Sequence, residues 1–162
     1  LYNVPARTVT DIQPETLIRI VADFPEVFVA VKDASGVLQR VSQHRAALGA
    51  GFCQLSGNDD LALGYNAMGG VGCISVTANV VPRLCADFQA ACAAGNAAKA
   101  LELHDRLFAL HVSLFTDASP GPVKYAMTRV RPGFPDGLRL PMTWPGEASR
   151  KAVDAGLARA GL

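Results

Sequence analysis

Short apolar runs, each followed by a segment with helical periodicity, most constrain the fold of this chain. Four runs end in Gly, Ser, Asn or Asp, and they lie at residues 1–4, 27–31, 52–56 and 72–79. Apolar strands that alternate with helices predict a parallel sheet covered on both faces. The period leaves two α/β architectures open, a small doubly wound sheet and half of a (βα)8 barrel.

The helical segments have recognisable starts and apolar faces. Pro14 suits the first position of a helix in which Leu17, Ile20, Val21 and Phe24 recur at helical spacing. Further helices are predicted near residues 38–48, 59–70, 82–94, 96–115, 123–130 and 147–160. The apolar side of the longest one is predicted to contain Leu101, Leu107, Phe108, Leu114 and Phe115.

Composition limits the class of protein. The chain has 162 residues, is 50% hydrophobic and has a net charge of +1 from 15 basic and 14 acidic residues. This balance favours one globular domain and argues against nucleic acid or an anionic membrane as the main partner. Four cysteines without a C-x-x-C pair or a disulfide-type spacing are typical of reduced thiols in a cytoplasmic protein.

Lys32 stands directly after the apolar run at residues 27–31. A lysine at the carboxyl end of a buried parallel strand lies where such folds place their sites. A partly dry strand end favours a neutral amine that can attack a carbonyl carbon. Position alone leaves the alternative of a solvated lysine paired with Asp33.

Tyr2 and Arg7 flank the first strand end. A phenol close to a Schiff-base lysine can relay protons, and a guanidinium can hold a substrate carboxylate through two hydrogen bonds. Taken singly, each residue has a plainer interpretation, namely a packed tyrosine and a solvated arginine.

Other motifs give weaker indications. The segment "LSGNDD" lacks the spacing of a phosphate-binding loop, and "GGVGCISVTAN" does not fit a dinucleotide fingerprint. His104 and His111 lie seven residues apart in a helical segment, which favours packing over metal binding.

Six ordered motifs together resemble the dihydrodipicolinate synthase family of the pyruvate-dependent class I aldolases. They are "YNVPART", "VAVKDASG", "LSGNDD", "GGVGCISVTAN", "PGPVK" and "LRLPM". The resemblance implies a (βα)8 TIM barrel with extra C-terminal helices, and an enzyme that needs no metal or organic cofactor. Val9 departs from the glycine that is common after "RT" in the family, and Cys73 stands where valine is usual.

The resemblance also implies roles for individual residues. Lys32 would form the Schiff base with pyruvate, and Tyr2 would relay protons. Arg7 would bind the carboxylate of L-aspartate 4-semialdehyde. Ile74 would line the pyruvate pocket through backbone atoms, and Gly57 would lie at the pocket rim. The implied reaction is the lyase-type condensation that commits carbon to diaminopimelate and lysine biosynthesis.

A whole barrel needs about 250 residues, so we expect this chain to be the C-terminal half of such a synthase. Residues 1–95 would supply strands 5–8, and residues 96–162 the C-terminal helical region. A missing N-terminal half of the barrel would contain the family's threonine pair. The family resemblance further implies a cytoplasmic homotetramer or homodimer. Four strands alone would expose two sheet edges and an apolar inner face.

Two other interpretations stay open. The chain could belong to a related pyruvate-dependent aldolase that uses a sugar acid or another aldehyde, as N-acetylneuraminate lyases do. It could also be a non-catalytic half-barrel that serves as an assembly module.

Overall fold

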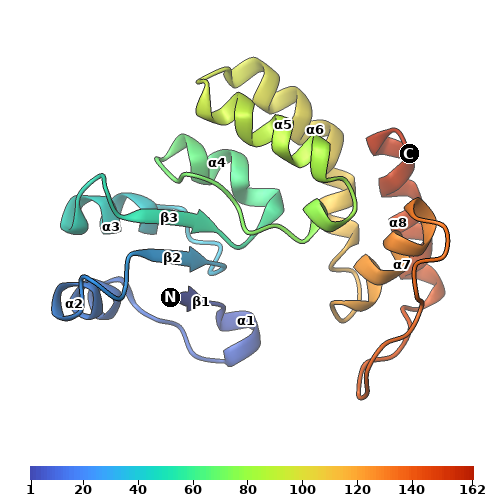
Figure 1. Cartoon of the computed structure of the whole chain (residues 1–162), viewed down its shortest axis with the longest axis horizontal. Helices are drawn as coiled ribbons and strands as arrows, with labels where there is room; N and C mark the ends of the chain where they lie inside the picture. The colour runs from blue at the N-terminus through green and yellow to red at the C-terminus, as the bar shows by residue number, and fades with distance from the viewer. The chain divides into compact units, whose positions relative to one another are not determined.

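The chain forms two compact units, Leu1–Ser75 and Val76–Leu162. A computed structural model describes all residues from 1 to 162. The first unit contains the sheet and the second is helical (Figure 1). The domain boundary predicted at residue 95 refers to the barrel of the family and stays a prediction.

The sheet of the first unit has three parallel strands in the order β1-β2-β3. The strands are β1 (Tyr2–Asn3), β2 (Ala30–Asp33) and β3 (Cys53–Ser56). Tyr2 is in register with Lys32, and Lys32 with Leu55. The predicted parallel α/β arrangement is therefore confirmed.

Helices cover one face of this sheet. Val31 of β2 is buried together with Leu17 and Val21 of α2 (Pro14–Asp23). On the same face, the Gln54 side chain donates a hydrogen bond to the carbonyl oxygen of Val41 in α3 (Gln39–Leu48), at 3.0 Å. Because side chains alternate along a strand, the row of Tyr2, Lys32 and Leu55 lies on the opposite face. The strands are thus not covered on both faces within this chain.

Three shorter helical elements complete the first unit. Helix α1 (Pro5–Thr8) follows β1, and a 3-10 turn η1 (Asp59–Leu61) leads from β3 into α4 (Ala62–Ala67). Pro5 and Pro14 each stand at the start of a helix, where the missing N–H of proline costs nothing.

The predicted start of the second strand is wrong. The second strand begins at Ala30 rather than at Val27, and Val27 and Val29 are 68% and 63% exposed. The N–H of Val27 instead bonds to the carbonyl of Phe24 in a turn after α2. Phe24 itself is exposed.

The run at 72–79 is not a strand. It pairs with β3 at a single bridge, Ser56 with Cys73, and then turns into the 3-10 helix η2 (Thr77–Asn79). Two backbone hydrogen bonds, Ser56 N–H to the Gly72 carbonyl and Ile74 N–H to the Ser56 carbonyl, hold this segment beside β3, but the ladder is too short for a fourth strand.

The second unit contains four helices beyond η2. They are α5 (Pro82–Ala93), α6 (Ala97–Ser113), α7 (Gly121–Val130) and α8 (Glu147–Ala160), close to their predicted positions. Helix α6 packs against both α5 and α8. At the α6–α8 crossing, a Cβ atom on Gly156 would lie 2.9 Å from the Cα of Leu110, so the two backbones approach closely.

The apolar face of α6 differs in part from its prediction. Leu107 and Leu114 are buried, but Leu101, Phe108 and Phe115 are each about half exposed. The buried side of α6 is instead the one that packs against α5 and α8. Its buried residues are Ala100, Leu103, Leu107, Leu110, His111 and Leu114.

The two histidines of α6 are packing residues, as predicted. His111 is buried and its Nδ1 lies 2.8 Å from Thr77 Oγ1, which ties η2 to α6. The ring of His104 packs near those of Phe88 and Phe108.

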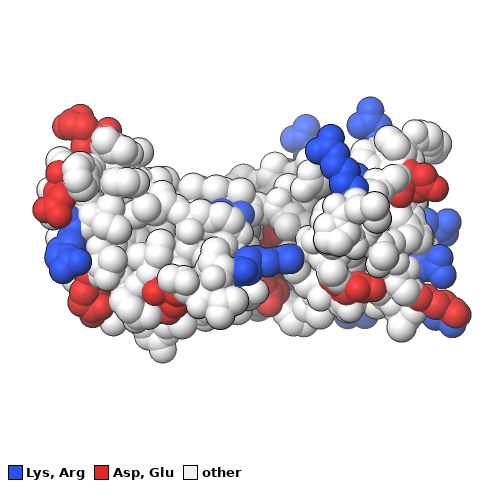
Figure 2. Space-filling view, turned by 90° about the horizontal axis from the view of Figure 1, so that it is seen from below, with Lys and Arg blue, Asp and Glu red and all other residues white.

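Positive and negative side chains are interspersed over the surface shown in Figure 2, and uncharged areas separate them. This mixed pattern agrees with the net charge of +1. None of the helices is both long and apolar enough to pass through a lipid bilayer.

Candidate active site

Tyr2 and Lys32 are neighbours on the sheet face that lies away from α2 and α3. The parallel register places them side by side, and the Lys32 Nζ atom lies 4.0 Å from the centroid of the Tyr2 ring. This distance is within the range of a cation–π interaction. The ring therefore restrains the amine at the carboxyl end of β2, with the phenol of Tyr2 on the same face.

The site is accessible from this side of the sheet. Tyr2 is 50% exposed and Lys32 is partly buried, whereas the residues on either side of Lys32, Val31 and Asp33, are buried. A small carbonyl compound can approach the amine from the exposed face. The chemistry available there is nucleophilic attack by an amine and proton transfer by a phenol.

Gly57 joins the ends of β2 and β3. Its N–H donates a hydrogen bond to the carbonyl of Asp33 at 2.7 Å. A Cβ atom at this position would lie 2.7 Å from the Cβ of Ala34, which real Cβ atoms do not tolerate. Glycine is thus required for the close approach of the two strand ends.

Ile74 lies beside the end of β3. Its N–H bonds to the carbonyl of Ser56 at 2.9 Å, and its side chain is half exposed. The carboxyl ends of β1, β2 and β3 and the segment at Ile74 therefore lie at the same end of the sheet. The roles expected for Tyr2, Lys32, Gly57 and Ile74 stay predictions.

Arg7 is the predicted site residue that does not lie on or directly beside the strand ends. It belongs to α1, in the loop of residues 4–13 between β1 and α2, and its side chain is exposed. No direct hydrogen bond or ion pair joins Arg7 to Lys32 or Tyr2 in this structure.

A partly buried polar network on the helix-covered face of the sheet was not predicted from the sequence. Asn3 and Asp33, in register on the helix-covered face, are 2% and 5% exposed, and the Asn3 Nδ2 atom donates to Asp33 Oδ1 at 3.1 Å. The N–H and the hydroxyl of Ser35 both donate to the same carboxylate, at 3.0 Å each. These bonds satisfy a carboxylate that is withdrawn from water.

The network continues to Asp11 and Arg40. The Arg40 guanidinium donates to both carboxylate oxygens of Asp11, at 2.7 and 2.6 Å, and to the carbonyl of Ile12 at 3.2 Å. The Asn3 amide donates to Asp11 at 2.9 Å and accepts from the N–H of Ile12 at 3.0 Å. The sequence signals Asn3 and Asp33 by their place at strand ends, but it offers no signal for a partner 29 residues away.

These contacts shift the ionisation of the pair. The pKa of Asp11 lies well below its usual range, mainly because the Arg40 guanidinium donates hydrogen bonds to its carboxylate. A hydrogen bond from the Asn3 amide lowers it further. The pKa of Arg40 is raised by the hydrogen bond to Asp11. Both groups are therefore charged at neutral pH.

His44 and Tyr65 are two further buried titratable residues of the first unit. Burial lowers the pKa of His44, whose Nδ1 lies 3.2 Å from Gln54 Oε1. Burial raises the pKa of Tyr65, which packs under Gly70. His44 lies beside Gln54 on the helix-covered face, and both side chains are buried.

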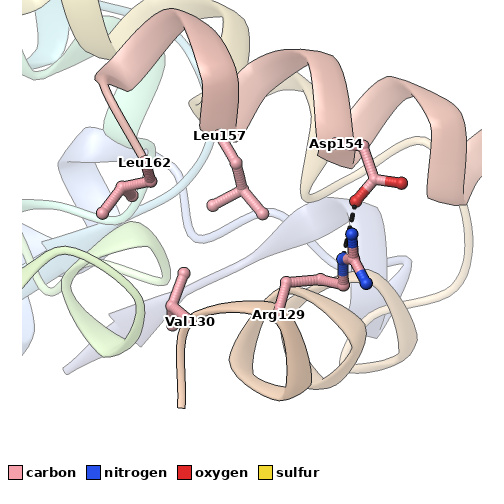
Figure 3. A pocket seen from close by; sticks show the side chains of 5 residues that line it. All are labelled: Arg129, Val130, Asp154, Leu157 and Leu162. Atoms are coloured by element: carbon pink, nitrogen blue, oxygen red, sulfur yellow. Dashed lines mark hydrogen bonds and ion pairs between the residues drawn. The ribbon is translucent and has the colours of Figure 1, made fainter. Parts of the chain in front are cut away.

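A separate cavity of about 340 Å³ lies between α7 and α8 (Figure 3). Its charged residues are already paired, since Arg129 Nε lies 3.2 Å from Asp154 Oδ1 and the Tyr125 hydroxyl donates to Asp154 Oδ2 at 2.8 Å. Val130, Leu157 and Leu162 line the rest. It contains none of the predicted site residues. No group of three or more His, Cys, Asp or Glu residues in the chain is placed so that it could hold a metal ion.

The Lys32 amine and the Tyr2 phenol lie at the carboxyl end of a parallel sheet, which is where α/β enzymes place their sites. The sequence model of the Dihydrodipicolinate synthetase family matches residues 1–160, and the chain belongs to this family.

The curated relatives agree with this assignment. The chain is 66% identical over all its 162 residues to the 4-hydroxy-tetrahydrodipicolinate synthase of Rhizorhabdus wittichii, and 62% identical to that of Novosphingobium aromaticivorans. It spans 55% of the length of each.

Solved structures share the fold. The 4-hydroxy-tetrahydrodipicolinate synthase of Methylacidiphilum fumariolicum SolV is 34% identical and superposes with a TM-score of 0.93, covering 99% of this chain and 53% of its own. The dihydrodipicolinate synthase of Thermotoga maritima gives 34% identity and a TM-score of 0.91, covering 99% of this chain and 55% of its own.

Proposed function

We propose that this chain forms part of a 4-hydroxy-tetrahydrodipicolinate synthase, a lyase that condenses pyruvate with L-aspartate 4-semialdehyde. The observation that supports this proposal most directly is the position of Lys32 at the carboxyl end of the sheet, where its Nζ atom lies 4.0 Å from the centroid of the Tyr2 ring. The reaction is inferred from the relatives that match the whole chain, which are named 4-hydroxy-tetrahydrodipicolinate synthases. The reaction opens diaminopimelate and lysine biosynthesis.

The first step is formation of the Schiff base. The Lys32 ammonium first gives up a proton, and the neutral amine attacks the ketone carbon of pyruvate. The resulting carbinolamine takes up a proton on its hydroxyl group and loses water to give an iminium. The iminium accepts electrons from the adjacent methyl group, which loses a proton to give an enamine. Tyr2 conveys protons in these steps through its hydroxyl. The lysine supplies the covalent activation itself, so the proposal includes no metal or organic cofactor.

The second step joins the two substrates. The enamine carbon attacks the aldehyde carbon of the semialdehyde, and the new oxyanion takes up a proton. Arg7 holds the carboxylate of the semialdehyde through its planar guanidinium. Backbone atoms at Ile74 line the pyruvate side, and Gly57 lies at the rim. The amino group of the semialdehyde then displaces Lys32 and closes the ring.

In architecture, we propose that residues 1–95 supply strands 5–8 of a (βα)8 barrel, with β1–β3 as the first three of these and the segment that bridges β3 at Cys73 in the place of the fourth. Residues 96–162 would form its C-terminal helical region. The remaining strands would come from sequence outside these 162 residues, in keeping with the 55% of the relatives that the chain spans. The exposed face with Tyr2 and Lys32 would then line the barrel interior. The assembled protein would be a cytoplasmic homodimer or homotetramer, although one structurally similar relative is described as a monomeric variant.

Borohydride trapping in the complete protein tests the central step. Incubation with pyruvate and borohydride is expected to add one reduced pyruvate unit to the peptide that contains Lys32, as measured by mass spectrometry. Lys32→Ala should abolish both the adduct and turnover, whereas Lys99→Ala, which removes a surface lysine paired with Glu102, should change neither. Turnover by Lys32→Ala at the wild-type rate would contradict the proposal.

Two further measurements separate the alternatives. Arg7→Ala should abolish most use of the semialdehyde and leave a neutral aldehyde little affected; equal losses for both would favour another aldehyde substrate. A particle mass equal to a stable oligomer of 17.0 kDa chains, without adduct formation, would favour a non-catalytic half-barrel.

A further inference from the structure

The loop of residues 4–13 is attached to the rest of the first unit mainly at its two ends. Within residues 4–10 the hydrogen bonds are local, such as Arg7 N–H to the Val4 carbonyl and the Thr8 hydroxyl to the Thr10 carbonyl. At the far end, Asp11 and Ile12 together receive bonds from Arg40 and exchange bonds with Asn3. Apart from the packing of Ile12 on the apolar core, the side-chain hydrogen bonds that join the loop to the rest of the unit all belong to this one cluster.

We infer that Asp11 and Arg40 are positioning residues that hold the Arg7 loop in place for the second substrate. The inference rests on the proposed function, because it assigns the recognition of a carboxylate-bearing aldehyde to Arg7. Neither residue touches the reacting atoms. They act by fixing the ends of the segment that contains Arg7.

The geometry explains why these two residue types are needed. The Arg40 side chain is 8% exposed, and its guanidinium forms two parallel bonds to Asp11 and a third to the Ile12 carbonyl. A lysine ammonium at this position lacks the planar fork that makes the two parallel bonds. An asparagine in place of Asp11 keeps the shape but removes the charge that balances the buried guanidinium.

The geometry also separates this role from that of the Schiff-base lysine. Lys32 is fixed by the ladder between β1 and β2, since its N–H bonds to the Leu1 carbonyl and the Ala34 N–H to the Asn3 carbonyl, each at 2.8 Å. Loss of the Asp11–Arg40 pair leaves these backbone bonds in place. The effect is therefore expected on the semialdehyde and not on pyruvate.

Steady-state kinetics of Asp11→Asn and Arg40→Lys in the complete protein test the inference. The KM for the semialdehyde is expected to rise by about 10- to 100-fold, because small displacements of a substrate-holding group have effects of this size. The KM for pyruvate and the yield of the borohydride adduct should stay within about twofold of wild type. Combined with Arg7→Ala, either variant should cause little further loss, because both act through one contact.

The control is Glu147→Gln, which removes an exposed ion pair of equal length, 2.6 Å to Lys151, in the second unit. It should leave all kinetic constants unchanged. A folded Asp11→Asn protein with the wild-type KM for the semialdehyde would overturn the inference. So would an additive loss in the double variant, or an equal loss of the pyruvate adduct.

Hydrogen exchange distinguishes a failure of this inference from a failure of the proposed function. Absence of a pyruvate adduct in the wild-type protein would reject the function alone. The amides of residues 6–10 should still exchange about fivefold faster or more in Asp11→Asn than in wild type or Glu147→Gln. Unchanged exchange in this segment would reject the positioning role whatever reaction the protein performs.

Discussion

Tyr2 and Lys32 stand opposite each other on β1 and β2, with the amine 4.0 Å from the centre of the phenol ring. The ring and the hydroxyl of Tyr2 therefore have separable contributions. The ring restrains the amine by a cation–π interaction, and the hydroxyl is the group that can move a proton.

Tyr2→Phe separates these two contributions. The ring remains, so the borohydride adduct with pyruvate should form to the wild-type extent when the reaction is complete. Turnover should fall by about 100-fold, a usual contribution of general acid–base catalysis. Tyr125→Phe, which removes the hydroxyl bonded to Asp154 in the second unit, serves as the control and should turn over normally. Normal turnover by Tyr2→Phe would remove the phenol from the mechanism.

Val9 is predicted to be a strained position. It ends α1 with a φ of 54°, in the left-handed region that β-branched residues avoid, and its side chain is 93% exposed. Val9→Gly should therefore raise the free energy of unfolding by about 1 kcal/mol. Chemical denaturation measures this change. Val27→Gly, at an exposed valine without positive φ, should give no gain, and an equal gain at both positions would refute the strain argument.

Gly57 should not tolerate a side chain. In Gly57→Ala the new methyl group would lie 2.7 Å from the Cβ of Ala34 and 3.2 Å from its backbone, so the ends of β2 and β3 must separate. The expected loss of stability is about 1–3 kcal/mol, as for other overpacked sites. Gly51→Ala is the matched control, because nothing lies within 4 Å of its Cβ position. Equal melting temperatures for the two variants would contradict the close approach.

The ion pair between Asp11 and Arg40 should make stability depend on pH in acid. The folded-state pKa of Asp11 lies below its ordinary value of 3.8, so its contribution is fully present above that value and is lost as the pH falls toward the folded-state pKa. At pH 7, Asp11→Asn should cost about 1.5–3 kcal/mol, the usual worth of hydrogen bonds to a charged group.

Urea titrations of wild type and Asp11→Asn at a series of pH values measure this dependence. The difference between the two should be constant from neutral pH to about pH 5 and should shrink below the ordinary pKa of the carboxyl group. Asp33 and Glu15, whose charges also act on Arg40, are common to both proteins and do not affect the difference. A difference that grows in acid has the wrong sign and excludes an ionised Asp11 as the cause.

The crossing of α6 and α8 gives a test in the second unit. Gly156→Ala places a methyl group 2.9 Å from both the Leu110 Cα and the Ser113 Oγ atoms. The clash should outweigh the better helix propensity of alanine and lower stability by about 1–2 kcal/mol. Gly137→Ala, with open space around it, should be close to neutral. Thermal unfolding distinguishes the two.

Much of the local structure follows from patterns within short stretches of sequence. Pro14 begins α2 because proline lacks only an N–H that the first helical turn does not use. The lysine at the end of the second apolar run predicts a site, because α/β folds place their sites at the carboxyl ends of strands. Local patterns were less reliable for strand bounds, since the apolar run from Val27 begins in a turn and the run from 72 to 79 forms a single bridge and a 3-10 turn.

The sequence by itself determined the α/β order of elements, the helix starts and the family motifs that contain Tyr2 and Lys32. Only the tertiary structure decided that these two side chains share the uncovered face of the sheet, and that Asn3, Asp11, Asp33 and Arg40 form one partly buried network on the helix-covered side. Helix and strand preferences come from interactions between residues close in the chain. A bond between Asp11 and Arg40 joins residues 29 positions apart, and it exists only because packing of α2 and α3 on β2 brings the two together.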